Sequence, residues 1–124
     1  MEQARVGYDD SPAWIEALCR IPQEWTIGDG LVRLHERFER ASPDLSDSAR
    51  AMALIRLRLV AEPDLAEAWQ IYSYDKRLRP SPYLDDCEVG YFDGKRRDVV
   101  RYDDRLEACA DFIVREARSI LANA

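Results

Sequence analysis

The sequence predicts an α+β domain in which N-terminal helices precede a small three-stranded antiparallel meander, and a long C-terminal helix packs against that sheet. Three observations support this prediction. Helical apolar spacing recurs through residues 11–61, strand-like runs flank the Asp93-Gly94 pair, and a continuous apolar stripe follows Tyr102. The 124 residues fit a single domain, 1–124, which is long enough to bury a core without disulfides or metals.

Three helices are expected before the sheet. The first spans about residues 11–20 and opens with a serine cap followed by proline, and the second spans about residues 29–40. The third begins at Ser46 or Asp47 and ends near Ala61, before a proline. Residues 55–60 alternate with period two, as a strand would, so strand is left open there, although the strong helix formers favour a helix.

The predicted meander has strands at residues 69–75, 88–93 and 97–102. Residues 69–75 are rich in aromatic and β-branched side chains, and residues 64–67 are expected to form one capped turn before them. The other two runs alternate imperfectly around an Asp-Gly pair, which is a strong hairpin signal. Between the first and second strands, the prolines of residues 79–88 predict a stiff, extended loop.

The C-terminal helix is expected to begin at Asp104 and Glu107, an Asp-x-x-Glu start. Its apolar residues form one stripe that needs a surface to cover, and the predicted sheet is the nearest such surface. The stripe consists of Leu106, Cys109, Ala110, Ile113, Ala117, Ile120 and Leu121.

Charge and cysteine content narrow the class of protein. The formal net charge of −6 disfavours nonspecific binding to nucleic acid or to an anionic membrane. The longest apolar run, near residues 51–55, is too short to span a bilayer, and the N-terminus lacks the pattern of a secretory signal. The three cysteines have no metal-ligand spacing, so small buried thiols are expected. We therefore expect a cytoplasmic protein with no membrane span.

No motif predicts a catalytic residue, a cofactor or a metal site. His35 is the only imidazole, but it shares a helical face with apolar residues, which favours a packed histidine over a general base. The Gly28-Asp29-Gly30 segment lacks the Lys-Ser/Thr pair of a phosphate loop, and helix capping explains it. The acidic groups Asp85-Asp86-Glu88 and Asp103-Asp104-Glu107 do not follow a calcium-loop spacing.

Tyrosine, arginine and aspartate gather around the predicted sheet. Basic residues at 76–79 and 95–97 lie near several tyrosines, an arrangement that suits stacking on bases, but interleaved acidic residues weaken that alternative. Because tyrosine and arginine are enriched at interface hot spots, a protein contact is favoured, with the loop at residues 79–88 as its centre. The predicted partner-binding residues are Tyr72, Tyr74, Arg77, Arg79, Tyr83, Asp85, Asp86 and Tyr91.

The leading functional hypothesis is a small acidic protein-binding module, such as an immunity or antitoxin-like inhibitor that blocks a basic partner protein. One alternative is a small enzyme whose pocket, between the helices and the sheet, uses carboxylates or His35. Another is a homo-oligomeric subunit that pairs through a sheet edge.

Overall fold

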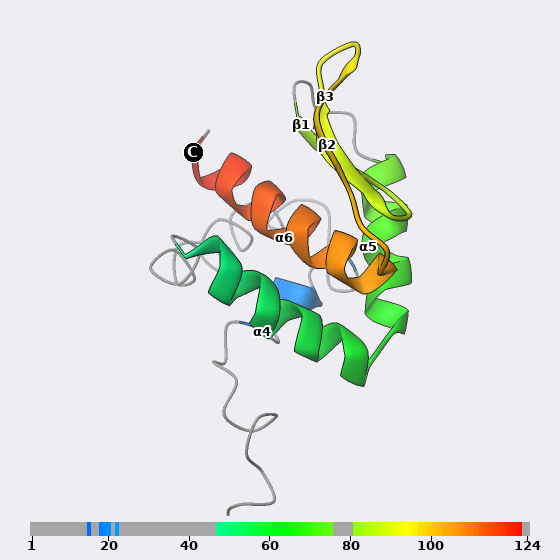
Figure 1. The fold of residues 1–124 in the computed structure, drawn as a ribbon, viewed down its shortest axis with the longest axis vertical. Helices are drawn as coiled ribbons and strands as arrows, with labels where there is room; N and C mark the ends of the chain where they lie inside the picture. Colours follow the sequence, from blue (N-terminus) through cyan, green and yellow to red (C-terminus); the bar gives the residue numbers. More distant parts are fainter. Residues whose placement is uncertain (1–14, 16–17, 21, 23–46, 76–80, 123–124) are drawn as a thin grey trace, which may run out of the picture.

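The computed structural model describes Ile15, residues 18–20, Pro22, residues 47–75 and residues 81–122. It confirms the α+β architecture: helices are followed by an antiparallel meander and then by a C-terminal helix (Figure 1). The elements are α4 (Ser48–Ala61), α5 (Asp64–Asp75), β1 (Ser81–Asp85), β2 (Glu88–Phe92), β3 (Arg96–Arg101) and α6 (Arg105–Ala122). The expected helix at residues 29–40, with His35, and most of the one at residues 11–20 lie outside the described residues.

Helix α4 confirms the third predicted helix and decides the open question at residues 55–60. The Asp47 carboxylate caps it by accepting a hydrogen bond from the backbone N–H of Arg50. Ile55 and Leu59 are fully buried, whereas the side chain of Leu57 between them is 54% exposed. A strand would have turned all three to the same face, so the period-two pattern is a helix with one apolar residue facing outward.

The prediction of a strand at residues 69–75 is wrong, because these residues form the second half of α5. The capped turn expected at residues 64–67 is instead the start of this helix. Leu65 and Trp69 are fully buried, and Tyr72 packs against the same core. Their spacing of four and three places them on one helical face, and burial of that face outweighs the β propensity of the aromatic residues.

The first strand of the meander, β1, lies inside the segment that was expected to be a loop. Its proline, Pro82, is compatible with a strand because β1 is at the edge of the sheet, where a missing N–H need not break the pairing. The β2–β3 hairpin was predicted correctly, and Gly94 in its turn has a φ of 109°, which favours glycine. The sheet order is β1-β2-β3, with all neighbours antiparallel.

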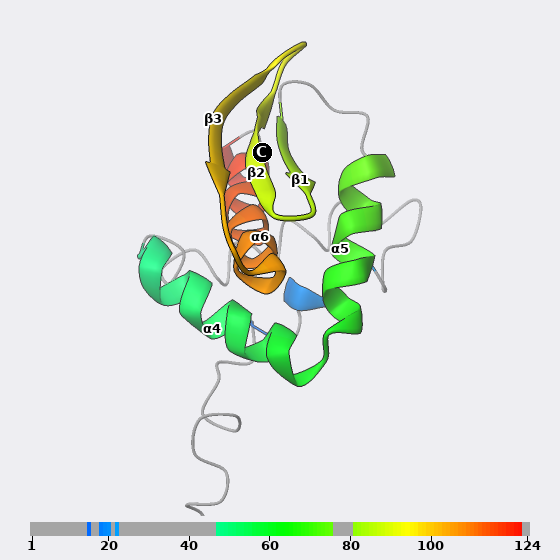
Figure 2. The ribbon, with the colours of Figure 1, turned by 45° about the vertical axis from the view of Figure 1, so that its right-hand side comes forward.

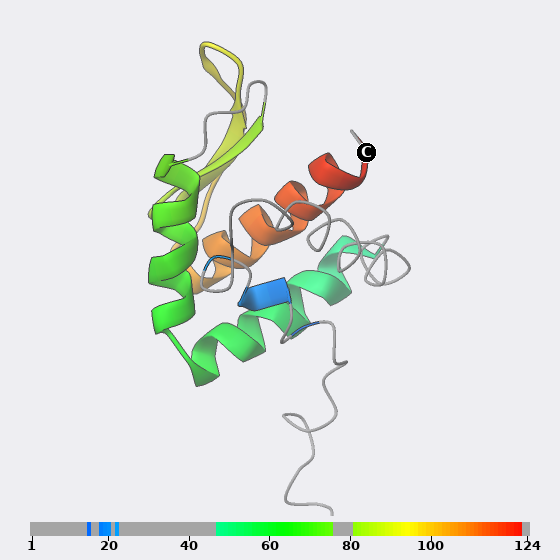
Figure 3. The same cartoon turned by 180° about the vertical axis from the view of Figure 1, so that it is seen from behind.

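Helix α6 covers one face of the sheet. The Asp104 carboxylate caps it by accepting a hydrogen bond from the backbone N–H of Leu106. Leu84 of β1 and Val89 of β2 are directly paired and buried in the core that α6 shares, which defines the inner face of the sheet. Figure 2 shows α6 behind the sheet and α5 beside β1. Helix α4 packs against the side of α6 that faces away from the sheet (Figure 3).

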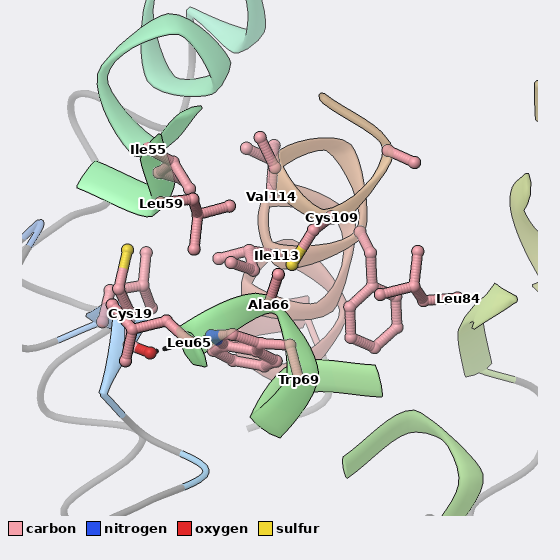
Figure 4. Packing of buried hydrophobic residues seen from close by; sticks show 14 of the residues in the cluster. Cys19, Ile55, Leu59, Leu65, Ala66, Trp69, Leu84, Cys109, Ile113 and Val114 are labelled. Atoms are coloured by element: carbon pink, nitrogen blue, oxygen red, sulfur yellow. Dashed lines mark hydrogen bonds between the residues drawn. The ribbon is translucent and has the colours of Figure 1, made fainter. Parts of the chain in front are cut away.

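The core is assembled around Trp69 (Figure 4). Its indole N–H donates a 2.9 Å hydrogen bond to the Cys19 carbonyl, which ties the N-terminal segment to α5. The ring also meets Phe112 of α6 edge-on at 5.9 Å. The thiols of Cys19 and Cys109 are buried, and Cys87 is partly exposed. Within the described part of the chain, none of the helices combines the length and the apolar character needed to cross a membrane.

Candidate functional site

The face of the sheet opposite α6, which we call the outer face, is polar. Strand residues alternate between faces, so Tyr83 and Asp85 of β1 point away from the side that carries Leu84. The pairing of Asp85 with Glu88, and of Glu88 with Arg101, continues this face across the sheet. The pairing places on the outer face Ser81, Tyr83, Asp85, Glu88, Gly90, Phe92, Arg96 and Arg101. Val99 is added because it precedes Val100, which pairs with Val89 of the inner face.

Glu88 is the central acceptor of the outer face. Its carboxylate accepts hydrogen bonds from the Tyr83 hydroxyl at 2.5 Å and from Arg96 at 2.8 Å, and it pairs with Arg101 at 3.1 Å. Only 13% of its side chain is exposed. The hydrogen bond from Tyr83 is the largest cause, and the hydrogen bond from Arg96 the next, that holds the pKa of Glu88 below its usual range. Glu88 is therefore ionised at neutral pH and serves as an anionic acceptor.

Tyr83 is fixed in place by its cross-strand partner, Gly90. A Cβ atom at Gly90 would lie 2.8 Å from the Tyr83 ring and 2.8 Å from the Arg97 carbonyl oxygen, so only glycine leaves room for the ring. The Arg96 guanidinium lies over the same ring, 4.9 Å from its centroid. Burial, and then the Glu88 carboxylate, raise the pKa of Tyr83 to about 12, so its hydroxyl stays a donor.

Asp85 joins the outer face to the end of α5. It accepts hydrogen bonds from Arg96 at 3.1 Å and from the Tyr74 hydroxyl at 3.3 Å. Together, Asp85 and Glu88 balance the charges of Arg96 and Arg101. The outer face is thus a compact network of ion pairs with no net charge from these four groups.

The two edges of the sheet differ in how far the described elements cover them. At the β1 edge, the Leu84 N–H donates to the Ser73 hydroxyl at 2.8 Å, and the Leu84 carbonyl accepts from the Gln70 amide. Gln70 also accepts from the Asp86 N–H at 2.7 Å, so α5 satisfies the backbone of this edge. At the other edge, every residue of β3 is exposed, including Val99. Helix α6 contacts this edge through Arg115, whose guanidinium donates a 3.2 Å hydrogen bond to the Asp98 carbonyl. The β3 edge is otherwise the more exposed of the two among the described elements.

The structure brings together part of the predicted partner-binding set. Tyr74, Tyr83 and Asp85 belong to one connected network, and Asp86 follows directly in the β1–β2 turn with a φ of 57°. Tyr72 is separate: its ring packs on Trp69 and Phe112, and its hydroxyl donates to Glu116 in the interior.

The remaining members of the predicted set do not join the outer face. Tyr91 pairs with Pro82 and, by alternation, points to the side that carries Val89. Arg77 and Arg79 lie outside the described residues.

Sequence reasoning missed Glu88, Arg96, Gln70 and Ser73 as parts of this arrangement. The contacts of Glu88 and Arg96 depend on the register between neighbouring strands, which the residue pattern of one strand does not determine. Gln70 and Ser73 both lie in the strand predicted at residues 69–75, whereas their spacing from Ala66 and Tyr74 is that of one helical face. This helical spacing was the signal in the sequence that could have placed Gln70 and Ser73 on α5.

In comparisons with known proteins, no family model, no curated protein and no solved structure matches this chain. Among the described residues, no group of three or more histidine, cysteine, aspartate or glutamate side chains is arranged to hold a metal ion.

Proposed function

We propose that this protein is a small protein-binding module, and that its contact surface is the outer face of the sheet together with Tyr74. The observation that carries the proposal is the Tyr83–Arg96–Glu88 network, which is ordered by internal contacts yet left uncovered by the described elements. Arg96 is 50% exposed and Arg101 is 79% exposed, so a partner reaches both without displacing the core.

The energetics of association favour such a surface. Tyrosine and arginine are among the residues most enriched at interface hot spots, because they combine large contact area with hydrogen-bonding groups. Here Tyr83 is already held by Gly90 and Arg96, so little side-chain entropy is lost when a partner docks. Truncation of Tyr83 in such a site weakens binding by about 1–4 kcal/mol.

We further propose that the partner is a basic protein and that this chain acts as an immunity or antitoxin-like inhibitor of it. The support is the net charge of −6 on a 124-residue chain. Long-range attraction of this kind mainly accelerates association and selects for a basic partner. Because Asp85 and Glu88 are balanced by arginines, the close contact itself depends on the tyrosine and arginine groups rather than on excess acidity.

A photo-crosslinking amino acid placed at Val99, on the outer face, tests this function in cells of the source organism. Leu57 on α4 is the matched control, because it is also an exposed aliphatic residue but lies away from the sheet. We expect one discrete protein adduct at Val99 that is absent at Leu57 and is lost when Tyr83→Ala is added. An adduct that persists with Tyr83→Ala, or no adduct at Val99, would refute the proposal.

The exposed β3 edge, which α6 contacts at the Asp98 carbonyl through Arg115, favours a second candidate, which is self-association by pairing of β3 with β3 of another copy. Sedimentation at tens of micromolar protein, roughly the range of weak association constants, separates the two candidates. A monomer at that concentration excludes strong self-pairing.

A further inference from the structure

The loop between β2 and β3 contains the Asp93-Gly94 bond, and this hairpin extends past the ends of the described helices (Figure 1). Asp93, Gly94 and Lys95 are all exposed. Apart from the chain neighbours of Gly94, no atom lies within 4 Å of the position that a Cβ atom would take there. Exposed loop tips are the parts of a folded chain that solvent reaches most readily, and water has open access to this bond.

The backbone nitrogen of Gly94 is a potential nucleophile. It lies one peptide bond after Asp93, so its attack on the Cγ atom of that aspartate closes a five-membered ring. Among the described residues, none accepts a hydrogen bond from the Gly94 N–H. Glycine has no Cβ atom that would shield its nitrogen, and its backbone is the one that adjusts most easily.

The Asp93 carboxylate, which would be attacked, is held by Arg97. Its Oδ2 atom lies 2.5 Å from a guanidinium nitrogen of Arg97, and the two side chains are 30% and 53% exposed. Closure of the ring removes one carboxylate oxygen and the negative charge, so the ion pair with Arg97 is lost. The pair therefore stabilises the unreacted aspartate and slows the attack.

We propose that Asp93 is a site of spontaneous isoaspartate formation, and that Arg97 is a positioning residue that slows this reaction. In the first step the bond between the Gly94 nitrogen and Cγ forms, and a bond between Cγ and oxygen breaks. The carboxyl oxygen leaves as water with the amide proton and the carboxyl proton. In the second step water opens the cyclic imide. Cleavage between the nitrogen and the original backbone carbonyl gives isoaspartate, whereas cleavage at Cγ restores aspartate.

The product would alter the sheet itself, because isoaspartate adds one methylene group to the main chain. Residues 93–95 form the loop that sets Phe92 opposite Arg96. Arg96 in turn bonds to Glu88 and lies over the Tyr83 ring. A longer loop disturbs this register, so the reaction at Asp93 is expected to loosen the outer face.

The test follows isoaspartate in the full-length protein, kept folded at neutral pH for several weeks. An isoaspartyl methyltransferase labels the product, and electron-transfer fragmentation of tryptic peptides assigns it to a residue. This assignment separates Asp93 from Asp29, the aspartate of the Gly28-Asp29-Gly30 segment, which lies outside the described residues. We expect isoaspartate at Asp93 to increase steadily with time.

Two arginines of β3 provide a matched pair of variants. Arg97→Gln should accelerate the reaction at Asp93 about two- to fivefold, since an exposed ion pair is weak. Arg97→Lys keeps the charge and should restore the slower rate. Arg101, which is 79% exposed and pairs with Glu88 at 3.1 Å, is the control, and Arg101→Gln should leave the rate unchanged.

Absence of isoaspartate at Asp93 in the folded protein would overturn the assignment of this site. Equal rates in Arg97→Gln and in the unsubstituted protein, or equal acceleration by Arg101→Gln, would overturn the role of Arg97. These outcomes do not depend on the proposed function, because the reaction needs only this chain and water.

Discussion

The inner and outer faces of the three-stranded sheet are built from alternate residues of the same strands, but different interactions hold them in place. On the inner face, Leu84 and Val89 are buried against α6. On the outer face, Tyr83 and Arg96 are fixed by hydrogen bonds and ion pairs that remain in contact with water. Full burial of an aliphatic side chain stabilises a fold by about 1.5–3 kcal/mol, whereas an exposed ion pair contributes about 0–1 kcal/mol.

Under the proposed function, this difference separates stability from recognition within one small element. The inner face fixes the position of the sheet on α6, so its residues have little freedom to change. The outer face contributes less to folding and is therefore free to serve contact with a partner. The following predictions test this separation, from the largest expected effect to the smallest.

Leu84→Ala should cause the largest loss of stability. The side chain is 2% exposed in the core, and its removal leaves a cavity that the surrounding helices fill only in part. We expect the free energy of unfolding to fall by about 2–5 kcal/mol, measured by urea denaturation. A loss below about 1 kcal/mol would show that the inner face does not hold the sheet.

Gly90→Ala, a change on the outer face, should lower the free energy of unfolding by about 1–3 kcal/mol. The new methyl group would meet the Tyr83 ring and the Arg97 carbonyl oxygen, each at 2.8 Å. Adding Tyr83→Ala should relieve part of this cost, because the ring is then gone, but the backbone contact with Arg97 remains. If Gly90→Ala is neutral in thermal denaturation, the ring is not packed on this glycine.

Glu88→Gln should lower the free energy of unfolding at neutral pH. It should also make that free energy fall less steeply as the pH is lowered. The folded-state pKa of Glu88 is lowered, first by the hydrogen bond from Tyr83 and then by Arg96. Its contribution is therefore present above the unfolded pKa of about 4.3 and is lost as the pH falls through the lower folded pKa. Urea denaturation between roughly pH 3 and 7 measures this, and an unchanged acid profile in the variant would contradict the assigned role of Glu88.

Tyr83→Phe should have the smallest effect, because the ring stays on Gly90 and only the hydroxyl is removed. We expect a loss of about 0.5–1.5 kcal/mol at most. The more sensitive readout is the pKa of Glu88, which should rise toward its usual value when the hydrogen bond from Tyr83 is absent. NMR titration of the Glu88 carboxyl carbon measures this shift, and a pKa that does not move would exclude that hydrogen bond as its main cause.

The sequence predicts those parts of the fold whose signals are local. Helix α6 and the β2–β3 hairpin were predicted from a continuous apolar stripe and an Asp-Gly turn. The second half of α5 is predicted as a strand because the β propensity of Trp69, Ile71 and Tyr72 competes with the helical spacing of the buried residues. Strand β1 is not predicted, because its proline, Pro82, favours a loop in the sequence pattern, although an edge strand tolerates proline.

The candidate site was predictable only in part. Tyr74, Tyr83 and Asp85 were identified from residue type, and the structure connects them. The central role of Glu88 and the stacking of Arg96 on Tyr83 depend on which residues face each other across strands. A sequence pattern gives the face of a residue more readily than its cross-strand partner.

The most direct test of the separation between the two faces is one variant measured in two ways. In Tyr83→Ala/Arg96→Ala, both the urea denaturation and the Val99 photo-crosslink are measured. We expect the free energy of unfolding to fall by less than about 2 kcal/mol, because these side chains are partly exposed, while the partner adduct disappears. A chain that unfolds, or an adduct that forms as in the unsubstituted protein, would contradict the claim that the outer face serves recognition rather than folding.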